Sequence, residues 1–453
     1  MFIDTHAHLF FENFKYDLEE VLNRAKEYKV NYIIVPSTDL KTTKEAILLT
    51  EKYEQIYATV GIHPHDTKDW NDSLITEIEK LTKHQKVIGI GEIGLDYYYD
   101  FSPREQQIKA FKSQLDLAVK LNLPVVIHNR DSDADMMEII KSYCGTGLKA
   151  QFHCFNGSSE DAIELMRMSH FISFTGNITF KKSESLRETL KHINLNHLML
   201  ETDSPFMTPV PYRGKRNEPA FISYVAQQIA DVHKISVEEL AKITSLNVFR
   251  FFGIGKKPET SFTYLLGNSL YINITNRCNA DCTFCSRKED PYLKGYNLGM
   301  KKSEEPAAEF YINEIGDPKK YEEVVFCGYG EPTIRWDVVK KIAEYVKNNG
   351  GKTRINTDGH GNIINKRDIT PEMKNLIDVV SISFNSADPK QYSELMRVSE
   401  EHFDAMKEFA IKSKPFVKKV VMTVVSLDKV EIEAARKVVE NEIGAEFRIR
   451  NYF

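Results

Sequence analysis

The chain has 453 residues, of which 42% are hydrophobic, and its formal net charge is −5 at pH 7. The length favours two domains, and the slightly acidic balance excludes a global basic field that would attract nucleic acid. No apolar run approaches the roughly 18 residues of a membrane-spanning helix, and the N-terminus has no signal-type segment. We therefore expect a cytoplasmic protein without membrane contact.

The chain opens with a short apolar run that leads into two histidines, His6 and His8. On an extended strand the side chains of residues i and i+2 point to the same face, so both imidazoles aim at one point. Two imidazoles in this arrangement favour a divalent-metal site, although an isolated pair of this kind is as often polar loop sequence. The rest of the first half, up to about residue 252, decides between a metal site and a polar loop.

Eight β-type runs alternate with helical patterns over this first half. They span residues 3–6, 32–36, 59–63, 87–92, 125–128, 150–153, 171–174 and 198–203. Amphipathic segments such as residues 105–121 lie between them, with apolar residues at helical spacing. This alternation over about 250 residues predicts an α/β fold, a (β/α)8 TIM-type barrel.

Polar side chains gather where these runs end. The set comprises His6, His8, His63, Glu92, His128, His153 and Asp203. In a barrel the carboxyl ends of the strands meet at one face, where the sites of such enzymes are built. A single buried histidine would more often be a satisfied core residue. Six or seven acid and imidazole groups cannot be buried together without a cation, so they predict a metal centre, and a bridging Glu92 could support two ions.

Six segments of the first half resemble the TatD family of metal-dependent nucleases. They are DTHAH at residues 4–8, GIHP at 61–64, GEIGLD at 91–96, HCF at 153–155, ETDSP at 201–205 and RGKRNEP at 213–219. The resemblance implies a two-metal site whose ligands are His6, His8, Glu92, His128, His153 and Asp203. It also implies that Glu92 bridges the ions and that His63 contacts substrate phosphate. Asp203 would orient the attacking water. The metal could be zinc, manganese or magnesium, because the sequence does not distinguish among them.

The substrate is expected to be a nucleic acid or another phosphodiester, which makes this half a deoxyribonuclease. A basic cluster of Arg213, Lys215 and Arg216 follows Asp203 and would take the phosphodiester backbone. Without the resemblance, such a run would be a solvated loop. The alternative is that the barrel hydrolyses a small ester, an amide or a modified nucleotide, since the same metal barrel serves many hydrolases.

A short segment rich in glycine and charge, residues 253–262, reads as a linker between domains 1–252 and 263–453. Three cysteines, Cys278, Cys282 and Cys285, follow the first β-run of the second domain. Three thiolates with no obvious fourth ligand nearby suit a [4Fe–4S] cluster with one open iron better than a closed zinc site.

This spacing, with Phe284 before the last cysteine, resembles the radical S-adenosylmethionine (SAM) superfamily. A Gly-rich turn after the next β-run, with Gly328, Gly330 and Glu331, resembles the superfamily's Gly-Gly-Glu-Pro motif, although its middle position departs. Six β-runs predict a (β/α)6 partial barrel. The resemblance implies that the turn binds the methionine amino group of SAM. Phe284 would pack against the adenine, and the other SAM contacts would be Asn356, Ser383 and Asn385.

The resemblance further implies that an electron from the cluster cleaves SAM to a 5′-deoxyadenosyl radical, with a reductant such as flavodoxin or ferredoxin as partner. The competing interpretation of this half is a structural iron–sulfur or zinc module. The fusion itself suggests that both halves act in one pathway.

Overall fold

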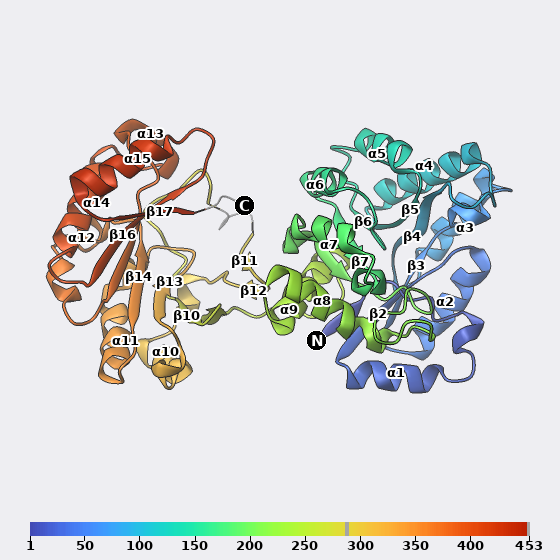
Figure 1. Cartoon of the computed structure of the whole chain (residues 1–453), viewed down its shortest axis with the longest axis horizontal. Coiled ribbons are helices and arrows are strands. Elements are labelled where there is room, and N and C mark those ends of the chain that lie inside the picture. Colours follow the sequence, from blue (N-terminus) through green and yellow to red (C-terminus); the bar gives the residue numbers. More distant parts are fainter. Residues whose placement is uncertain (286–289, 451–453) are drawn as a thin grey trace. The chain divides into compact units, whose positions relative to one another are not determined.

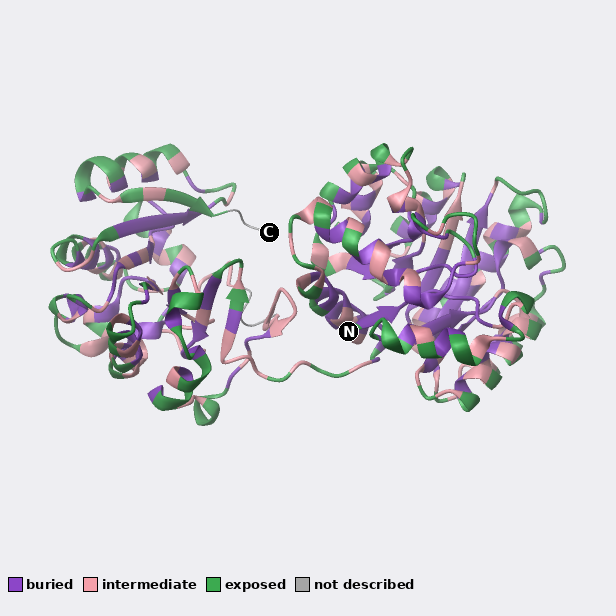
Figure 2. Cartoon of the chain, turned by 60° about the horizontal axis from the view of Figure 1, so that its bottom comes forward, coloured by how far each residue is buried: buried purple, intermediate pink, exposed green. Residues whose placement is uncertain are grey.

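The structure is a computed structural model that describes residues 1–285 and 290–450. The chain divides into two compact units, Met1–Pro258 and Glu259–Phe453, and the segment expected as a linker, residues 253–262, spans this division (Figure 1). Each unit has its own hydrophobic core (Figure 2). No helix among the described residues combines the length and the apolar character needed to span a membrane.

The first unit confirms the predicted barrel. Its sheet holds eight parallel strands that pair in chain order. They are β1 (Phe2–Asp4), β2 (Val30–Pro36), β3 (Ile56–Val60), β4 (Val87–Asp96), β5 (Val125–Arg130), β6 (Ala150–Phe152), β7 (Phe171–Phe174) and β8 (Leu198–Leu200). The strands are mostly buried (Figure 2), as expected where helices cover a parallel sheet.

Nine α-helices connect and cover these strands among the described residues. They are α1 (Leu18–Glu27), α2 (Leu40–Lys52), α3 (Asp72–Leu81), α4 (Arg104–Leu121), α5 (Asp133–Ser142), α6 (Ser159–Arg167), α7 (Glu184–Lys191), α8 (Ile222–His233) and α9 (Val237–Phe252). Local chemistry sets several of their starts. Asp39 accepts a hydrogen bond from the Thr42 amide at the start of α2, and Ser236 accepts one from the Glu239 amide at the start of α9.

The barrel closes where the first strand meets the last. The Thr5 amide donates to the Leu200 carbonyl at 3.0 Å, and the Asp203 amide donates to the His6 carbonyl at 2.8 Å. The buried Asp4 carboxylate accepts hydrogen bonds from the amide and hydroxyl of Thr202 at 2.9 and 2.6 Å. We call this junction between β1 and β8 the seam. It lies at the face of the barrel where the strands end and the polar side chains gather.

The second unit contains a seven-stranded sheet in the order β17-β16-β15-β14-β13-β10-β9. Six strands are parallel, as predicted: β10 (Ser269–Asn273), β13 (Val324–Cys327), β14 (Thr353–Thr357), β15 (Val379–Ser383), β16 (Lys419–Val425) and β17 (Glu446–Arg450). The seventh, β9 (Thr263–Leu266), was not predicted and pairs antiparallel with β10. A two-stranded ribbon of β11 (Tyr292–Leu293) and β12 (Tyr296–Asn297) lies outside this sheet.

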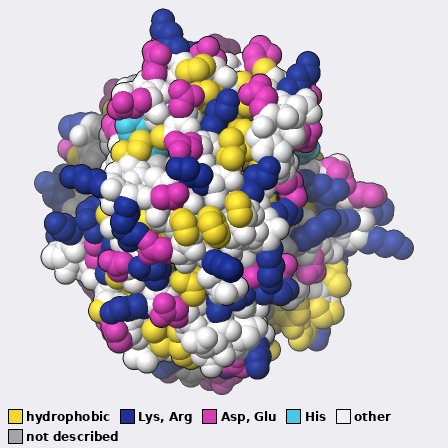
Figure 3. Space-filling view, turned by 90° about the vertical axis from the view of Figure 1, so that its left-hand side faces the viewer, with side chains coloured by type: hydrophobic (Ala, Val, Ile, Leu, Met, Phe, Trp, Pro, Cys, Tyr) yellow, Lys and Arg dark blue, Asp and Glu magenta, His cyan; other side chains and the backbone are white. Residues whose placement is uncertain are grey.

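The helices of this unit are α10 (Ala308–Ile315), α11 (Trp336–Asn348), α12 (Gly361–Asn365), α13 (Pro389–Met396), α14 (Glu401–Ser413) and α15 (Ile432–Lys437). Their apolar faces pack on alternate residues of the strands, such as Ile272, Phe326 and Ile382. The other residues of these strands, including Asn356 and Ser383, are left for the opposite face of the sheet. On the face drawn in Figure 3, Lys and Arg side chains are interspersed with Asp and Glu.

Candidate functional site

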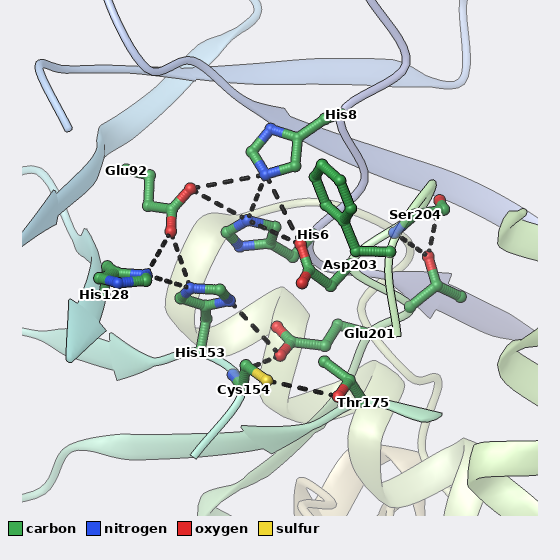
Figure 4. Close-up of polar contacts among 12 residues, drawn as sticks. His6, His8, Glu92, His128, His153, Cys154, Thr175, Glu201, Asp203 and Ser204 are labelled. Atoms are coloured by element: carbon green, nitrogen blue, oxygen red, sulfur yellow. Dashed lines mark hydrogen bonds and ion pairs between the residues drawn. The ribbon is translucent and has the colours of Figure 1, made fainter. Parts of the chain in front are cut away.

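Four predicted side chains converge at the seam (Figure 4). The Nε2 atoms of His6 and His8 lie 3.2 Å apart, and Glu92 Oε2 lies 3.4 and 3.5 Å from them. Asp203 Oδ1 lies 3.8 Å from His6 Nε2 and 3.6 Å from His8 Nε2. Ligands about 2.1 Å from a tetrahedral ion are about 3.4 Å from one another, so this spacing fits one divalent ion.

A second group surrounds the other carboxylate oxygen of Glu92. Glu92 Oε1 lies 3.0 Å from His128 Nδ1 and 2.8 Å from His153 Nε2 (Figure 4). His63 Nε2 lies 3.6 Å from the same oxygen. The two nitrogens of His128 and His153 are 3.3 Å apart. The ligand atoms of His63, Glu92 and His128 also lie within 4.8 Å of one another, so His63 is placed as closely as a ligand would be.

The electrostatics of the site favour donor atoms without protons at His8, His63 and Glu92. Burial, reinforced by His6, lowers the pKa of His8 to about 3, and burial lowers that of His63 to about 4. Burial alone would raise the pKa of Glu92, but His153, His63 and His6 together hold it well below its usual value. These three groups are therefore in the forms that bind a metal ion. Against burial, neighbouring carboxylates raise the pKa of His128 and, well above its usual value, that of His153, and burial raises the pKa of Asp203 to about 8. A bound ion would displace the protons of these last three groups.

An irregularity in β4 directs Glu92 toward the histidines. Its pairing with β5 runs from Ile90 beside Val125 to Ile93 beside Ile127, so β4 carries one extra residue at Gly91–Glu92. Such a bulge re-aims the side chains next to it. Gly94 follows at a point where a Cβ atom would lie 1.9 Å from the His128 carbonyl oxygen. Only glycine lets β4 approach β5 this closely.

Three further residues of the site, His65, Asp96 and Glu201, were not predicted. Asp96 Oδ2 lies 2.9 Å from His128 Nε2 and 2.9 Å from His65 Nε2. Glu201 is fully buried, lies 3.7 Å from His153 Nδ1 and accepts hydrogen bonds from Ser173 and Gln151. A carboxylate behind a ligating histidine fixes its ring and raises its basicity. Asp96 and Glu201 follow strand ends like the predicted ligands, which was the signal available in the sequence.

The site opens into a pocket of about 890 Å³. Its lining includes Tyr98, Tyr99 and Arg130 together with the polar residues His8, His63, His65, Glu92, Asp96, His128, His153 and Asp203. None of the basic cluster of Arg213, Lys215 and Arg216 is among its lining residues. Arg216 instead forms a two-point ion pair with Asp17, at 2.7 and 2.6 Å, and Arg213 lies over the Phe180 ring. The structure therefore does not bring the predicted phosphate cluster into the pocket.

In the second unit, the cysteine loop follows β10 and is attached to α13. The amides of Asp281 and Thr283 donate to the carbonyls of Met396 and Leu395 at 3.0 and 2.8 Å. Cys278 and Cys282 pack against the core of this unit, as does Phe284. None of the groups that could hold a single ion within the described residues contains a cysteine. In a [4Fe–4S] cluster each cysteine binds a different iron, so their sulfurs need not converge on one point.

The Gly-rich turn lies directly against the segment that leads to the cysteines. The Gly330 amide donates to the Thr275 carbonyl at 3.0 Å, and the Glu331 amide donates to the Arg277 carbonyl at 2.8 Å. A Cβ atom on Gly330 would lie 2.1 Å from the Arg277 oxygen, so only glycine fits. At Gly328, which has a φ of 140°, a Cβ atom would lie 2.8 Å from the Thr275 carbonyl oxygen and 2.9 Å from Asn273 Oδ1.

The Glu331 side chain turns inward, away from solvent. Its carboxylate accepts hydrogen bonds from the Thr333 amide, the Thr357 hydroxyl and the Asp358 amide, at 2.9, 2.9 and 2.7 Å. Glu331 is 2% exposed, so it ties the turn to the end of β14.

The three remaining predicted SAM contacts follow neighbouring strands. Asn356 and Ser383 lie in β14 and β15, and Asn385 follows β15. The Oδ1 atoms of Asn356 and Asn385 are buried and accept no hydrogen bond among the described residues. Unsatisfied buried acceptors of this kind fit a polar ligand with N–H groups.

Comparison with known proteins identifies the class of both units. The family profile described as TatD related DNase matches residues 3–253, and that of the radical SAM superfamily matches residues 272–440. The chain therefore belongs to the TatD family of metal-dependent hydrolases and carries a radical SAM domain after the barrel, and both domains indicate an enzyme. These families imply divalent metal ions, an iron–sulfur cluster and SAM.

Individual relatives match the barrel along its whole length. The uncharacterized metal-dependent hydrolase YabD of Bacillus subtilis (strain 168) is 45% identical over 254 residues, which is 56% of this chain and 100% of that protein. The 3′-5′ ssDNA/RNA exonuclease TatD of Pectobacterium parmentieri is 32% identical over 255 residues, 55% of this chain and 98% of that one. The crystal structure of the TatD homologue YJJV of Escherichia coli K12 superimposes with a TM-score of 0.54 at 29% identity and covers 56% of this chain and 98% of its own.

Proposed function

We propose that the first unit hydrolyses phosphodiester bonds of nucleic acid with two divalent ions. The observation that carries this proposal is the position of Glu92, whose two oxygens face two separate sets of imidazole nitrogens at 2.8–3.6 Å. His6, His8 and Asp203 would hold one ion and His128 and His153 the other. A relative named as a 3′-5′ ssDNA/RNA exonuclease supports a nucleic-acid substrate.

Bound divalent ions would supply a water of lowered pKa and stabilise the attacking and leaving oxygens. The protein would supply orientation. Asp203 would position the attacking water and accept its proton, and His63 would donate a hydrogen bond to a phosphate oxygen. Asp96 and Glu201 would keep the rings of His128 and His153 in place. Zinc, manganese and magnesium are all compatible with this mixed donor set.

The test compares release of a 3′ label from an oligodeoxynucleotide with hydrolysis of small aryl esters, with each metal in turn. We expect label release that His128→Ala abolishes and that His192→Ala, at an exposed histidine, leaves unchanged. Hydrolysis of the esters without release of the label would favour the alternative of a small ester, amide or modified nucleotide. Unchanged release by His128→Ala would refute the metal site.

We further propose that the second unit binds a [4Fe–4S] cluster through Cys278, Cys282 and Cys285 and cleaves SAM reductively. The hydrogen bonds between the Gly-rich turn and the segment before Cys278 carry this proposal, because they hold the expected SAM and cluster sites against each other. The cluster and SAM, once bound, would supply radical chemistry. Gly328, Gly330 and Glu331 would shape the methionine site, and Phe284, Asn356, Ser383 and Asn385 would complete the SAM contacts.

This second proposal is tested by anaerobic reconstitution with iron and sulfide, followed by SAM and dithionite in place of a cytoplasmic flavodoxin or ferredoxin. We expect 5′-deoxyadenosine from the native chain and from a Cys144→Ala control, and none from Cys282→Ala. If the chain holds a full cluster but forms no 5′-deoxyadenosine, the second unit is a structural or electron-carrying module.

A further inference from the structure

Three exposed aromatic side chains follow β4 at the rim of the metal pocket. Tyr98, Tyr99 and Phe101 are 57%, 40% and 57% exposed, and we call residues 97–101 the aromatic loop. Tyr98 and Tyr99 line the same pocket as the metal-site histidines. Clustered exposed apolar groups beside a pocket are typical of a surface that binds a ligand or another macromolecule.

Two rings of the aromatic loop, those of Tyr99 and Phe101, lie as parallel plates, and the Tyr98 ring stands at 87° to that of Tyr99. Tyr99 and Phe101 stack with their centroids 5.2 Å apart and their planes 13° from parallel. His65 stands edge-on to both, with centroid distances of 5.3 and 4.8 Å. A flat ligand ring can extend such a stack on its open side.

A cation lies over the same rings. The guanidinium carbon of Arg130 is 3.8 Å from the Tyr98 ring centroid and 4.9 Å from that of Tyr99. Within residues 1–285 and 290–450, no carboxylate forms an ion pair with Arg130. Arg130 lines the pocket, so its charge is available to an anion, and a guanidinium suits the geometry of phosphate.

One carboxylate connects this rim to the candidate metal centre. Asp96 Oδ1 accepts hydrogen bonds from the amides of Tyr98 and Tyr99, both at 3.0 Å. Its Oδ2 is 2.9 Å from both His65 and His128. The aromatic loop is therefore positioned by the same side chain that positions His128.

We propose that the aromatic loop and Arg130 form a subsite for one unpaired nucleotide next to the scissile bond. Arg130 binds the neighbouring phosphate, and Tyr99 with Phe101 stacks the base. Bases inside a duplex are already stacked and cannot reach such a platform, so the nucleotide in this subsite is unpaired. The inference rests on the proposed phosphodiester hydrolysis by the first unit. In it, Tyr99, Phe101 and Arg130 bind the substrate and take no part in the chemical step.

The first experiment measures binding without turnover. The full-length Asp203→Asn chain is titrated against a fluorescein-labelled oligodeoxythymidine and against the same strand with its terminal bases removed. We expect the strand with bases to bind about tenfold more tightly, the size of one base–aromatic stack. Phe101→Ala should remove most of this preference, because it deletes one ring of the Tyr99–Phe101 stack. Tyr28→Ala, at an exposed tyrosine outside the lining of the pocket, should keep it.

The second experiment isolates the phosphate contact. The binding constant is measured over a range of salt concentrations, where each neutralised phosphate contributes about one unit to the slope of log K against log salt. Arg130→Gln should reduce that slope by about one, and Arg167→Gln, at an exposed arginine on α6, should not. In turnover assays of the chain with Asp203 intact, Phe101→Ala and Arg130→Gln should raise KM with little change in kcat.

Equal binding of the two strands would overturn the subsite, as would a loss of kcat at saturating substrate with KM unchanged in the rim variants. Failure of the proposed function has a different signature. If no phosphodiester is cleaved with any metal while the preference for bases persists, the subsite stands and the hydrolytic proposal falls.

Discussion

Asp96 connects three parts of the candidate site with a single carboxylate: His128, His65 and the backbone of the aromatic loop. Its neighbours hold its pKa below the usual range despite burial, His128 being the foremost of them. The charge of Asp96 is therefore retained at neutral pH. Asp96 would therefore affect the reaction through the position of His128 and of the aromatic loop, without contact to the substrate.

We expect Asp96→Asn to lower metal affinity or hydrolytic activity about 10- to 100-fold, because His128 loses the charge that orients it. Metal content after dialysis and kcat report the effect, and Asp69→Asn on an exposed loop is the matched control. A normal metal content together with a normal kcat would show that Asp96 does not support the ligands.

Among the residues, the sequence predicted the ligands that the strands carry to one face and missed the side chains that lie behind those ligands. The structure brings together six predicted residues that lie in strands or shortly after them: His6, His8, Glu92, His128, His153 and Asp203. His65 and Asp96 meet because the loop after β3 folds over the end of β4. The ion pair of Arg216 with Asp17 joins residues far apart in the chain, which no local pattern reveals.

At the scale of elements, the parallel strands of both units were predictable because each is a short apolar run between helical patterns. Strand β9 was missed, although Gly267 and Asn268 between two apolar runs are typical of a tight hairpin. The irregularity in β4 that directs Glu92 was also not predicted, because a bulge depends on the register of the neighbouring strand.

The turn after β13 depends on Gly330, which meets the backbone of the segment before Cys278. We expect Gly330→Ala to separate the two segments and to lower the iron bound per chain after reconstitution. Gly267→Ala, in open space, carries only the strain of its positive φ, roughly 1 kcal/mol. Equal iron content in the two variants would contradict this account.

Asp378 holds the starts of two strands of the second unit together. Its Oδ2 accepts from the Thr353 amide at 2.9 Å and from Lys347 Nζ at 2.7 Å, and Oδ1 lies 2.8 Å from Lys418 Nζ. Although burial opposes it, these partners, with Lys347 foremost, lower the pKa of Asp378 to about 2. A folded-state pKa below the unfolded value of about 3.9 stabilises the fold above that value.

We therefore expect Asp378→Asn to lower the free energy of unfolding at pH 7 by about 1–3 kcal/mol. The difference from the native chain should shrink as the pH falls from about 4 to about 2, where the native carboxylate is protonated. Denaturant unfolding across this range measures it, with Asp428→Asn at an exposed loop as control. A difference independent of pH would mean that the charge of Asp378 does not matter.

At the scale of the whole molecule, each unit has its own core, and the candidate metal and cluster sites fall in different units. We expect two thermal transitions. A chelator of divalent metals should lower the transition of the first unit, because a ligand present at 100 times its Kd adds about 2.7 kcal/mol to the stability of the state that binds it. Calorimetry of fragments 1–258 and 259–453 assigns the transitions, and a chelator shift of the second transition alone would reverse the assignment.

The seam has a consequence for how the barrel is made. Its candidate ligands come from both ends of the first unit, with His6 and His8 on one side and Asp203 on the other. A ribosome therefore produces the histidine pair first and the last carboxylate almost two hundred residues later. A nascent chain that stops before β8 has neither the closing strand nor Asp203, so a truncated product lacks the complete candidate metal site.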